Sequence, residues 1–177
     1  LRTLGTKAGA ITLLGDAFKC VIAVLVVRML FAGKYPDMLP LLSIYTAAGV
    51  VLGHNFPFYM NFKGGKGIAA TAGLILSMSW QMTLLSILTF GTAVALTHYV
   101  SLGSLLVYAG LMIQLVIFGQ TGFFAEMSQG QLIEMYIVFG CLLVLAYWKH
   151  RENIVRLVQG KERKTYLFKK NKTEEGK

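Results

Sequence analysis

The sequence predicts an all-α fold, a polytopic transmembrane helical bundle with about six spans. Of its 177 residues, 55% are hydrophobic and only 14% are charged, and the mean hydropathy is +0.61. Soluble domains of this length do not have such a composition. Apolar stretches of the roughly 20 residues that a helix needs to cross a bilayer recur along the chain with short polar breaks. Several spanning helices are therefore expected to pack together.

Six apolar stretches qualify as spans. A turn that contains Gly33 and Pro36 separates the first two, and a polar segment over residues 119–131 precedes the last. The third stretch is short, and we expect it to be partly re-entrant. An even number of crossings places both ends of the chain on one side. The expected spans cover residues 8–31, 38–52, 67–79, 80–97, 102–118 and 132–148.

Basic residues are distributed unequally between the two sides. With six spans, one side holds Lys63, Lys66 and the tail after Trp148, which carries most of the 17 Lys and Arg residues, whereas Lys34 is the only unambiguous basic residue opposite. The positive-inside rule makes the richer side cytoplasmic, in a bacterial plasma (inner) membrane. The net charge of +9 therefore indicates a tail that contacts anionic membrane lipids, not a nucleic-acid arm.

This charge pattern divides the chain into two parts. Residues 1–148 form the expected transmembrane domain, and residues 149–177 form a cytoplasmic interfacial helix and basic tail. No obligate protein partner is expected.

Two charged residues lie within the first expected span. Asp16 and Lys19 are three residues apart, so their side chains can meet on a helix. We interpret them as a structural ion pair, with a role in holding a polar site as the alternative. Cys20 and Cys141 also lie in apolar segments and are expected to be small core residues, so neither a disulfide scaffold nor a metal site is predicted.

The most informative stretch is GHNFPFYMNFKGGKGIAAT, residues 53–71, which is dense in glycine and directly precedes an apolar helix. Its glycines can turn several N–H groups inward, the next helix presents its positive end, and two lysines add charge. We interpret it as a phosphate cradle; the alternative is a flexible loop whose lysines only enforce topology. It does not match the nucleotide-binding pattern G-x-x-x-x-G-K-[ST], so ATP is not expected. The residues concerned are Lys63, Gly64, Gly65, Lys66 and Gly67.

A second stretch, KHRENIVRLVQGKE over residues 149–162, predicts a helix at the membrane interface. Its spacing puts His150 and Asn153 on one face, with Arg156 one turn further along. The alternative is a helix whose apolar residues are simply buried among lipid headgroups.

A third stretch, THYVSLGS over residues 97–104, returns to the same side. Its Ser101 is a candidate site residue. The alternative is that Ser101 and Ser104 only cap the next helix.

Together these stretches resemble one family. GHNFPFYMNFKGGKG and KHRENIVRLVQGKE, in this order and at this distance, are similar to the second and third signature motifs of the bacterial acyl-phosphate:glycerol-3-phosphate acyltransferases, and LRTLGTKAGAITLLGDAFK and YVSLGS extend the likeness over nearly the whole chain. The resemblance implies transfer of a fatty acyl group from acyl phosphate to glycerol 3-phosphate, which gives lysophosphatidic acid and phosphate in phospholipid biosynthesis. No cofactor is implied.

Three departures from that family are visible. Its members usually have seven spans, and this chain is expected to lack the N-terminal span and to begin with Leu1 and Arg2 at the end of the first motif. His98 stands where an arginine often precedes Tyr-Val-Ser-Leu-Gly-Ser, and Lys149 stands where an arginine often precedes the motif histidine.

The resemblance also implies roles for individual residues. Asn153 would orient the nucleophile or the developing charge, and Ser101 and His150 would bind phosphate or the glycerol hydroxyls, with His150 also able to act as base; these three form the implied catalytic group. No G-x-S-x-G elbow is present, which favours direct transfer without an acyl-enzyme. The rival hypotheses are a non-enzymatic anion-binding, phospholipid-binding or transport protein and an inactive fragment of the enzyme. The implied substrate-binding and phosphate-binding residues are Arg2, His54, Lys63, Gly64, Gly65, Lys66, Gly67 and Arg156.

Overall fold

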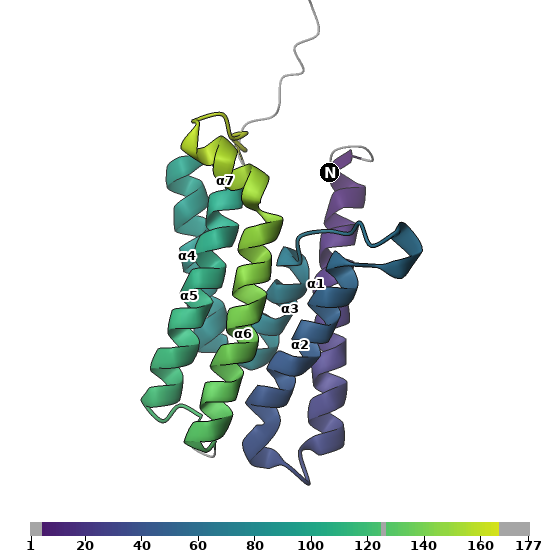
Figure 1. The fold of residues 1–177 in the computed structure, drawn as a ribbon, viewed down its shortest axis with the longest axis vertical. Coiled ribbons are helices and arrows are strands. Elements are labelled where there is room, and N and C mark those ends of the chain that lie inside the picture. The colour runs from purple at the N-terminus through teal and green to yellow at the C-terminus, as the bar shows by residue number, and fades with distance from the viewer. Residues whose placement is uncertain (1–4, 125–126, 167–177) are drawn as a thin grey trace, which may run out of the picture.

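The structure, a computed structural model, describes residues 5–124 and 127–166, and these contain helices and connecting loops but no strand. Figure 1 shows the longer helices standing side by side as a bundle, with α7 lying across one end. The α-helices are α1 (Gly5–Phe31), α2 (Leu39–Asn55), α3 (Ile68–Met78), α4 (Trp80–Thr97), α5 (Val100–Gln120), α6 (Gln129–Lys149) and α7 (Arg151–Val158), and the 3-10 helices are η1 (Pro36–Met38) and η2 (Phe58–Met60).

The predicted transmembrane bundle is confirmed. In the described part of the chain, five helical stretches are long and apolar enough to cross a membrane, and α3 is a shorter apolar helix. With 11 residues, α3 rises only about 16 Å, roughly half of a hydrocarbon core. The third predicted span is therefore the short one, as expected.

The position of α3 is fixed at its far end. Arg28, near the end of α1, donates a hydrogen bond to the carbonyl oxygen of Ser77 in the last turn of α3. Because α3 is short and ends at this level, the loop before it lies part of the way down the bundle, below the start of α1 (Figure 1). The start of α1 and α7 lie at one end of the bundle, as an even number of passes requires.

Helices α5 and α6 extend further into the predicted polar segment than expected. Helix α5 ends at Gln120, and α6 begins at Gln129. A capping box explains the second boundary: the Ser128 hydroxyl accepts from the Gln131 backbone N–H at 3.3 Å, and the Gln131 side chain accepts from the Ser128 N–H at 2.7 Å. These bonds satisfy N–H groups that a helix start leaves unpaired, so a polar sequence can begin a spanning helix.

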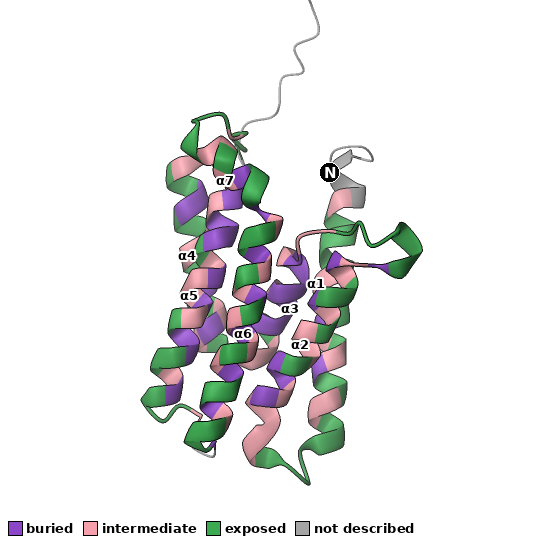
Figure 2. Cartoon of the chain, in the orientation of Figure 1, coloured by how far each residue is buried: buried purple, intermediate pink, exposed green. Residues whose placement is uncertain are grey.

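The buried residues face the inside of the bundle, and the outward faces are exposed (Figure 2). Large apolar side chains on those faces, such as Ile11, Ile87 and Ile137, are exposed, which suits a surface in contact with lipid. Cys20 is buried as predicted, but the prediction for Cys141 is wrong, because Cys141 is exposed on the outward face of α6. An apolar sequence segment does not distinguish a lipid-facing position from a core position.

Small residues let α1 and α3 approach closely. A Cβ atom at Gly73 would overlap the carbonyl oxygen of Ala17 and lie 2.8 Å from the Cβ atom of Cys20. Such small-residue contacts are the usual way in which membrane helices pack backbone to backbone. Helix α3 is thereby held against α1, with its N-terminus beside the glycine-rich loop.

Candidate active site

The loop between α2 and α3 is tied to the end of α2 by its backbone. The N–H groups of Gly64 and Gly65 donate to the carbonyl oxygens of Asn55 and His54, each at 3.2 Å. These carbonyls belong to the last turn of α2, where a helix leaves acceptors unpaired. A Cβ atom at Gly64 would overlap the carbonyl oxygen of His54 and lie 2.5 Å from Cδ of Pro57. The close approach therefore requires glycine.

The loop delivers the chain to the N-terminus of α3. Gly67 has φ +82°, the left-handed conformation that favours glycine. No side chain caps the first N–H groups of α3, so the positive end of that helix is presented toward the loop. Asn55 is fully buried beside Gly67, and its amide oxygen and nitrogen have no hydrogen-bond partner among the described residues.

The structure brings this loop and the C-terminal segment together. Lys66 Nζ donates a hydrogen bond to Oδ1 of Asn153, a residue of α7 that is 7% exposed. The two residues are 87 positions apart. A second link comes from Lys149, at the end of α6, whose Nζ donates to the carbonyl oxygen of Asn55 at 2.9 Å.

Glu162 is a member of the site that was not predicted from the sequence. Its carboxylate accepts hydrogen bonds from Asn153 Nδ2 at 2.7 Å, Ser101 Oγ at 2.9 Å and Arg156 Nε at 2.8 Å. The Glu162 side chain is 8% exposed. Burial raises the pKa of this carboxyl, but the hydrogen bonds from Asn153, Arg156 and Ser101 outweigh burial and bring the pKa below its ordinary value. Glu162 is thus an ionised anchor.

The contact with Glu162 bears on the alternative for Ser101, that this serine only caps α5. The N-cap of α5 is Tyr99, and no side chain makes the capping bond. Ser101 instead donates to Glu162, and Ser104 donates to the carbonyl oxygen of Val100 at 2.9 Å. The capping interpretation of these serines is wrong, and Ser101 lies in the cluster around Asn153.

Replacing Glu162 by glutamine should destabilise the protein by about 1–3 kcal/mol, because the new amide group would face the N–H of Arg156 and leave a donor unpaired. Thermal unfolding of the purified protein in detergent measures this. Glu152 provides the matched control: its side chain is 77% exposed and lies 3.9 Å from the same arginine, so Glu152→Gln should leave the midpoint unchanged. Equal midpoints for both variants would contradict the anchoring role.

His150 follows the last residue of α6 and is 2% exposed. Its Nδ1 lies 2.8 Å from the carbonyl oxygen of Ala146. A carbonyl only accepts, so we assign the ring proton to Nδ1, which leaves the lone pair of the neutral ring on Nε2. Burial lowers the pKa of His150, and the charge of Lys66 lowers it further, against the opposing effects of the Ala146 carbonyl and Glu162.

The predicted ion pair on α1 is confirmed and is joined to the site. Lys19 Nζ lies 2.6 Å from Asp16 Oδ1 and 3.2 Å from His54 Nδ1. Of the remaining predicted site residues, Lys63 is exposed on the loop, and Arg2 lies outside the described residues. The backbone oxygen of His98 accepts from the Thr165 N–H at 2.7 Å, which holds the segment after α7 against the α4–α5 turn.

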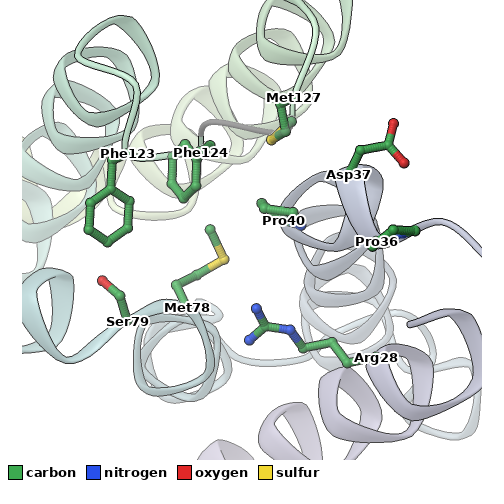
Figure 3. A pocket seen from close by; sticks show the side chains of 9 residues that line it. All are labelled: Arg28, Pro36, Asp37, Pro40, Met78, Ser79, Phe123, Phe124 and Met127. Atoms are coloured by element: carbon green, nitrogen blue, oxygen red, sulfur yellow. The ribbon is translucent and has the colours of Figure 1, made fainter. Parts of the chain in front are cut away.

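A pocket of about 360 Å³ lies elsewhere, at the end of the bundle where α1 and α3 finish. Figure 3 shows the guanidinium of Arg28 pointing into it. None of the residues predicted from the sequence to bind substrate lines this pocket, so it is separate from the cluster around Lys66. No group of three or more His, Cys, Asp or Glu within residues 5–124 and 127–166 could hold a metal ion. The lining residues are Arg28, Pro36, Asp37, Pro40, Met78, Ser79, Phe123, Phe124 and Met127.

The fold and the cluster define a class: a polytopic membrane protein whose glycine loop, helix N-terminus and lysines gather at one site. A protein-family model described as glycerol-3-phosphate acyltransferase matches residues 1–160. The glycerol-3-phosphate acyltransferase of Thermotoga petrophila is 41% identical over 171 residues, which cover 96% of this chain and 78% of the relative. That of Clostridioides difficile is 37% identical over 93% of this chain and 74% of its own length. The chain therefore belongs to the glycerol-3-phosphate acyltransferase family.

Two solved structures are also similar to this chain. The crystal structure of an integral membrane glycerol 3-phosphate acyltransferase in its glycerol 3-phosphate form is 27% identical, with a TM-score of 0.77 over 95% of this chain and 78% of that chain. Its lysophosphatidic acid form gives a TM-score of 0.75. The family resemblance predicted from the motifs is confirmed, and with it an acyltransferase built as a multi-pass membrane protein.

Proposed function

We propose that this acyltransferase takes its fatty acyl group from an acyl phosphate and transfers it to glycerol 3-phosphate, giving lysophosphatidic acid and inorganic phosphate. Membership of the family supports acyl transfer to glycerol 3-phosphate, a reaction of phospholipid synthesis. The observation that carries the proposed site is the hydrogen bond between Lys66 and Asn153, which joins the glycine loop to α7.

The chemistry needs little from the protein because an acyl phosphate is already activated. The glycerol hydroxyl oxygen attacks the acyl carbonyl carbon and gives its proton to a base, the carbon–oxygen bond to phosphate breaks, and phosphate leaves with that bonding pair. The enzyme has to hold the two substrates together, neutralise two phosphate groups that repel one another, and stabilise the oxyanion between attack and departure.

The glycine loop meets the electrostatic requirement. Lys66 supplies a full positive charge, the uncapped N–H groups of α3 supply partial charges, and the glycines let the loop pack closely against the end of α2. The buried, unpartnered amide of Asn55 beside Gly67 adds a donor that a bound oxyanion would satisfy. The positive charge and the unpaired donors together favour a phosphate over a neutral ligand.

His150 supplies the group that takes the hydroxyl proton, and Asn153 positions Lys66. With its proton held on Nδ1 by Ala146, His150 presents the lone pair of Nε2, the form that a general base needs. Glu162 holds the amide nitrogen of Asn153, so the amide oxygen faces Lys66. The lysine is thereby kept at the point where α7 meets the loop.

The pH dependence tests the base. Because the pKa of His150 lies below its ordinary value of about 6.5, its contribution to kcat/KM should be constant at higher pH and fall only below that value. The phosphate of the substrate ionises in the same range, so the ratio of the parent rate to the residual rate of His150→Gln is the quantity to measure. A ratio that does not fall on acidification would contradict the role of base.

The lowered pKa of His150 also predicts how the stability of the fold depends on pH. At His150 the folded protein binds fewer protons than the unfolded chain in the window between the two pKa values, so this group's contribution to stability is complete above about pH 6.5 and decreases below it.

We also place the site at the cytoplasmic face of a bacterial plasma membrane, where membrane lipids surround the bundle. The bias of lysine and arginine toward the end that carries α7 supports this orientation. The division into a part over residues 1–148 and a part over residues 149–177 stays a prediction.

The test of the donor uses membranes that contain the chain, acyl phosphate and labelled glycerol 3-phosphate. We expect labelled lysophosphatidic acid and one inorganic phosphate released for each molecule formed. Acyl thioester in place of acyl phosphate should give no product. Binding of glycerol 3-phosphate without any product would instead favour the non-enzymatic or transport hypothesis, and absence of both would favour an inactive fragment.

A further inference from the structure

Three ionisable side chains of the spanning helices α1 and α2 meet beside the glycine loop. Asp16 Oδ1 lies 2.6 Å from Lys19 Nζ and 3.3 Å from His54 Nδ1, and the same His54 nitrogen lies 3.2 Å from Lys19 Nζ. The side chains of Asp16 and His54 are each 19% exposed. Ionisable groups in spanning helices are costly to hold and generally indicate a function. The two residues on α1 have no role in the reaction scheme above.

The contacts of Nδ1 bear on which ring nitrogen of His54 carries a proton. An ammonium group only donates, so we assign the neutral ring the tautomer in which Nδ1 accepts from Lys19 and the ring proton is on Nε2. When the ring is protonated, Nδ1 donates to the carboxylate of Asp16, which only accepts, and Nε2 again carries a proton. The pair on α1 therefore suits both charge states of the ring, and Nε2–H is a donor in each.

The Nε2 edge of this ring lies against the loop. A Cβ atom at Gly65 would overlap Nε2 and lie 2.9 Å from Cε1 of His54. The backbone N–H of Gly65 also donates to the His54 carbonyl oxygen at 3.2 Å. The ring thus fills the side-chain space of Gly65, the residue directly before Lys66, and its Nε2 lies against the loop backbone.

We propose that Asp16 and Lys19 are positioning residues that hold His54 with Nε2–H directed at the glycine loop, where it donates to the phosphate of bound glycerol 3-phosphate. This inference rests on the proposed function, because the phosphate is that of the acyl acceptor. Lys19 acts only through His54. Without Lys19, the neutral ring is free to move its proton to Nδ1 and donate to Asp16, and Nε2 would then turn a lone pair toward the phosphate.

The kinetic test compares Lys19→Met with Lys19→Arg in the full chain, reconstituted in lipid. Loss of a hydrogen bond to a charged group predicts that Lys19→Met raises KM for glycerol 3-phosphate roughly tenfold to a hundredfold, while kcat changes by less than about threefold. Lys19→Arg keeps a cationic donor and should restore KM to within about threefold of the parent. A lysine with only a structural role would not give this division between KM and kcat.

Lys34→Met is the matched control. Lys34 is an exposed lysine in the turn at the opposite end of the bundle, so this variant loses the same charge without touching the cluster. Its KM and kcat should equal those of the parent. An unchanged KM in Lys19→Met, or an equal rise in both variants, would overturn the proposal.

A second measurement needs no activity. Nitrogen NMR of the protein labelled at its histidines reports which ring nitrogen is protonated, and His54→Gln identifies the His54 signals among the three histidines. We expect the neutral parent ring to be protonated at Nε2 and the Lys19→Met ring to shift toward Nδ1. A parent ring protonated at Nδ1 overturns the inference even if acyl transfer is observed. Conversely, an Nε2–H ring in a protein that forms no lysophosphatidic acid would refute the proposed function and leave the positioning role standing.

Discussion

Replacing Lys66 by methionine should reduce kcat/KM for glycerol 3-phosphate by about 10²–10³-fold. Methionine has a similar length and no charge, so the substitution removes the ammonium group that bonds to Asn153 while filling a similar space. A preorganised donor in a partly buried site commonly contributes an effect of this size to catalysis. The initial rate of lysophosphatidic acid formation, measured over a range of glycerol 3-phosphate concentrations, gives the ratio.

Lys63→Met is the graded comparison for this result. Lys63 is on the same loop but is exposed, where water and salt screen its charge. Its loss should reduce kcat/KM by no more than about tenfold, and added salt should diminish the difference from the parent. If both variants lost the same activity, the loop would act as a diffuse positive patch and not through the contact between Lys66 and α7.

Gly64→Ala should have the second large effect, a loss of at least about 10²-fold in kcat/KM. The added methyl group would overlap the carbonyl oxygen of His54, which is backbone, and also meets Pro57. Neither can move aside as a flexible side chain would, so the loop itself has to shift. A misplacement of about 1 Å in a substrate-positioning segment is enough for such a loss.

The control for Gly64 is Gly53→Ala, near the end of α2. A Cβ atom at Gly53 would meet no atom within 4 Å, and alanine is a better helix former than glycine. This variant should keep the parent activity and stability. If Gly64→Ala behaved like Gly53→Ala, the loop would be adaptable, and its hydrogen bonds to the end of α2 would not set the geometry of the site.

The sequence was sufficient to predict the bundle and the glycine loop. Hydropathy identifies spans because only helices satisfy their own backbone in a bilayer, and Gly64, Gly65 and Gly67 are informative because few other residues tolerate their geometry. It was also sufficient to associate Lys66 with Asn153, but only through the family resemblance. No local pattern relates two residues 87 positions apart.

Glu162 shows what local patterns miss. It lies in a strongly basic segment, where the sequence gives no reason to distinguish an acidic residue from ordinary surface charge. Its importance comes from the turn after α7, which folds back toward the α4–α5 turn through the bond between Thr165 and His98. That turn brings the carboxylate to Ser101, 61 positions away. Tertiary contacts of this kind depend on how the helices pack, which composition and spacing do not specify.

The depth of the glycine loop has a consequence for how the enzyme meets its donor. Helix α1 continues 11 residues from Asp16 to its start at Gly5, so the loop beside Asp16 lies about 16 Å below the end of that helix. Extracting a fatty chain of about 15 methylenes into water would require roughly 12 kcal/mol, at ~0.8 kcal/mol for each methylene. Because the loop is set back from that end of the bundle, we expect the donor to react while its fatty chain stays in the hydrocarbon. Its turnover should then follow the mole fraction of donor in the bilayer, and diluting the vesicles with buffer at fixed lipid composition should leave saturation by the donor unchanged.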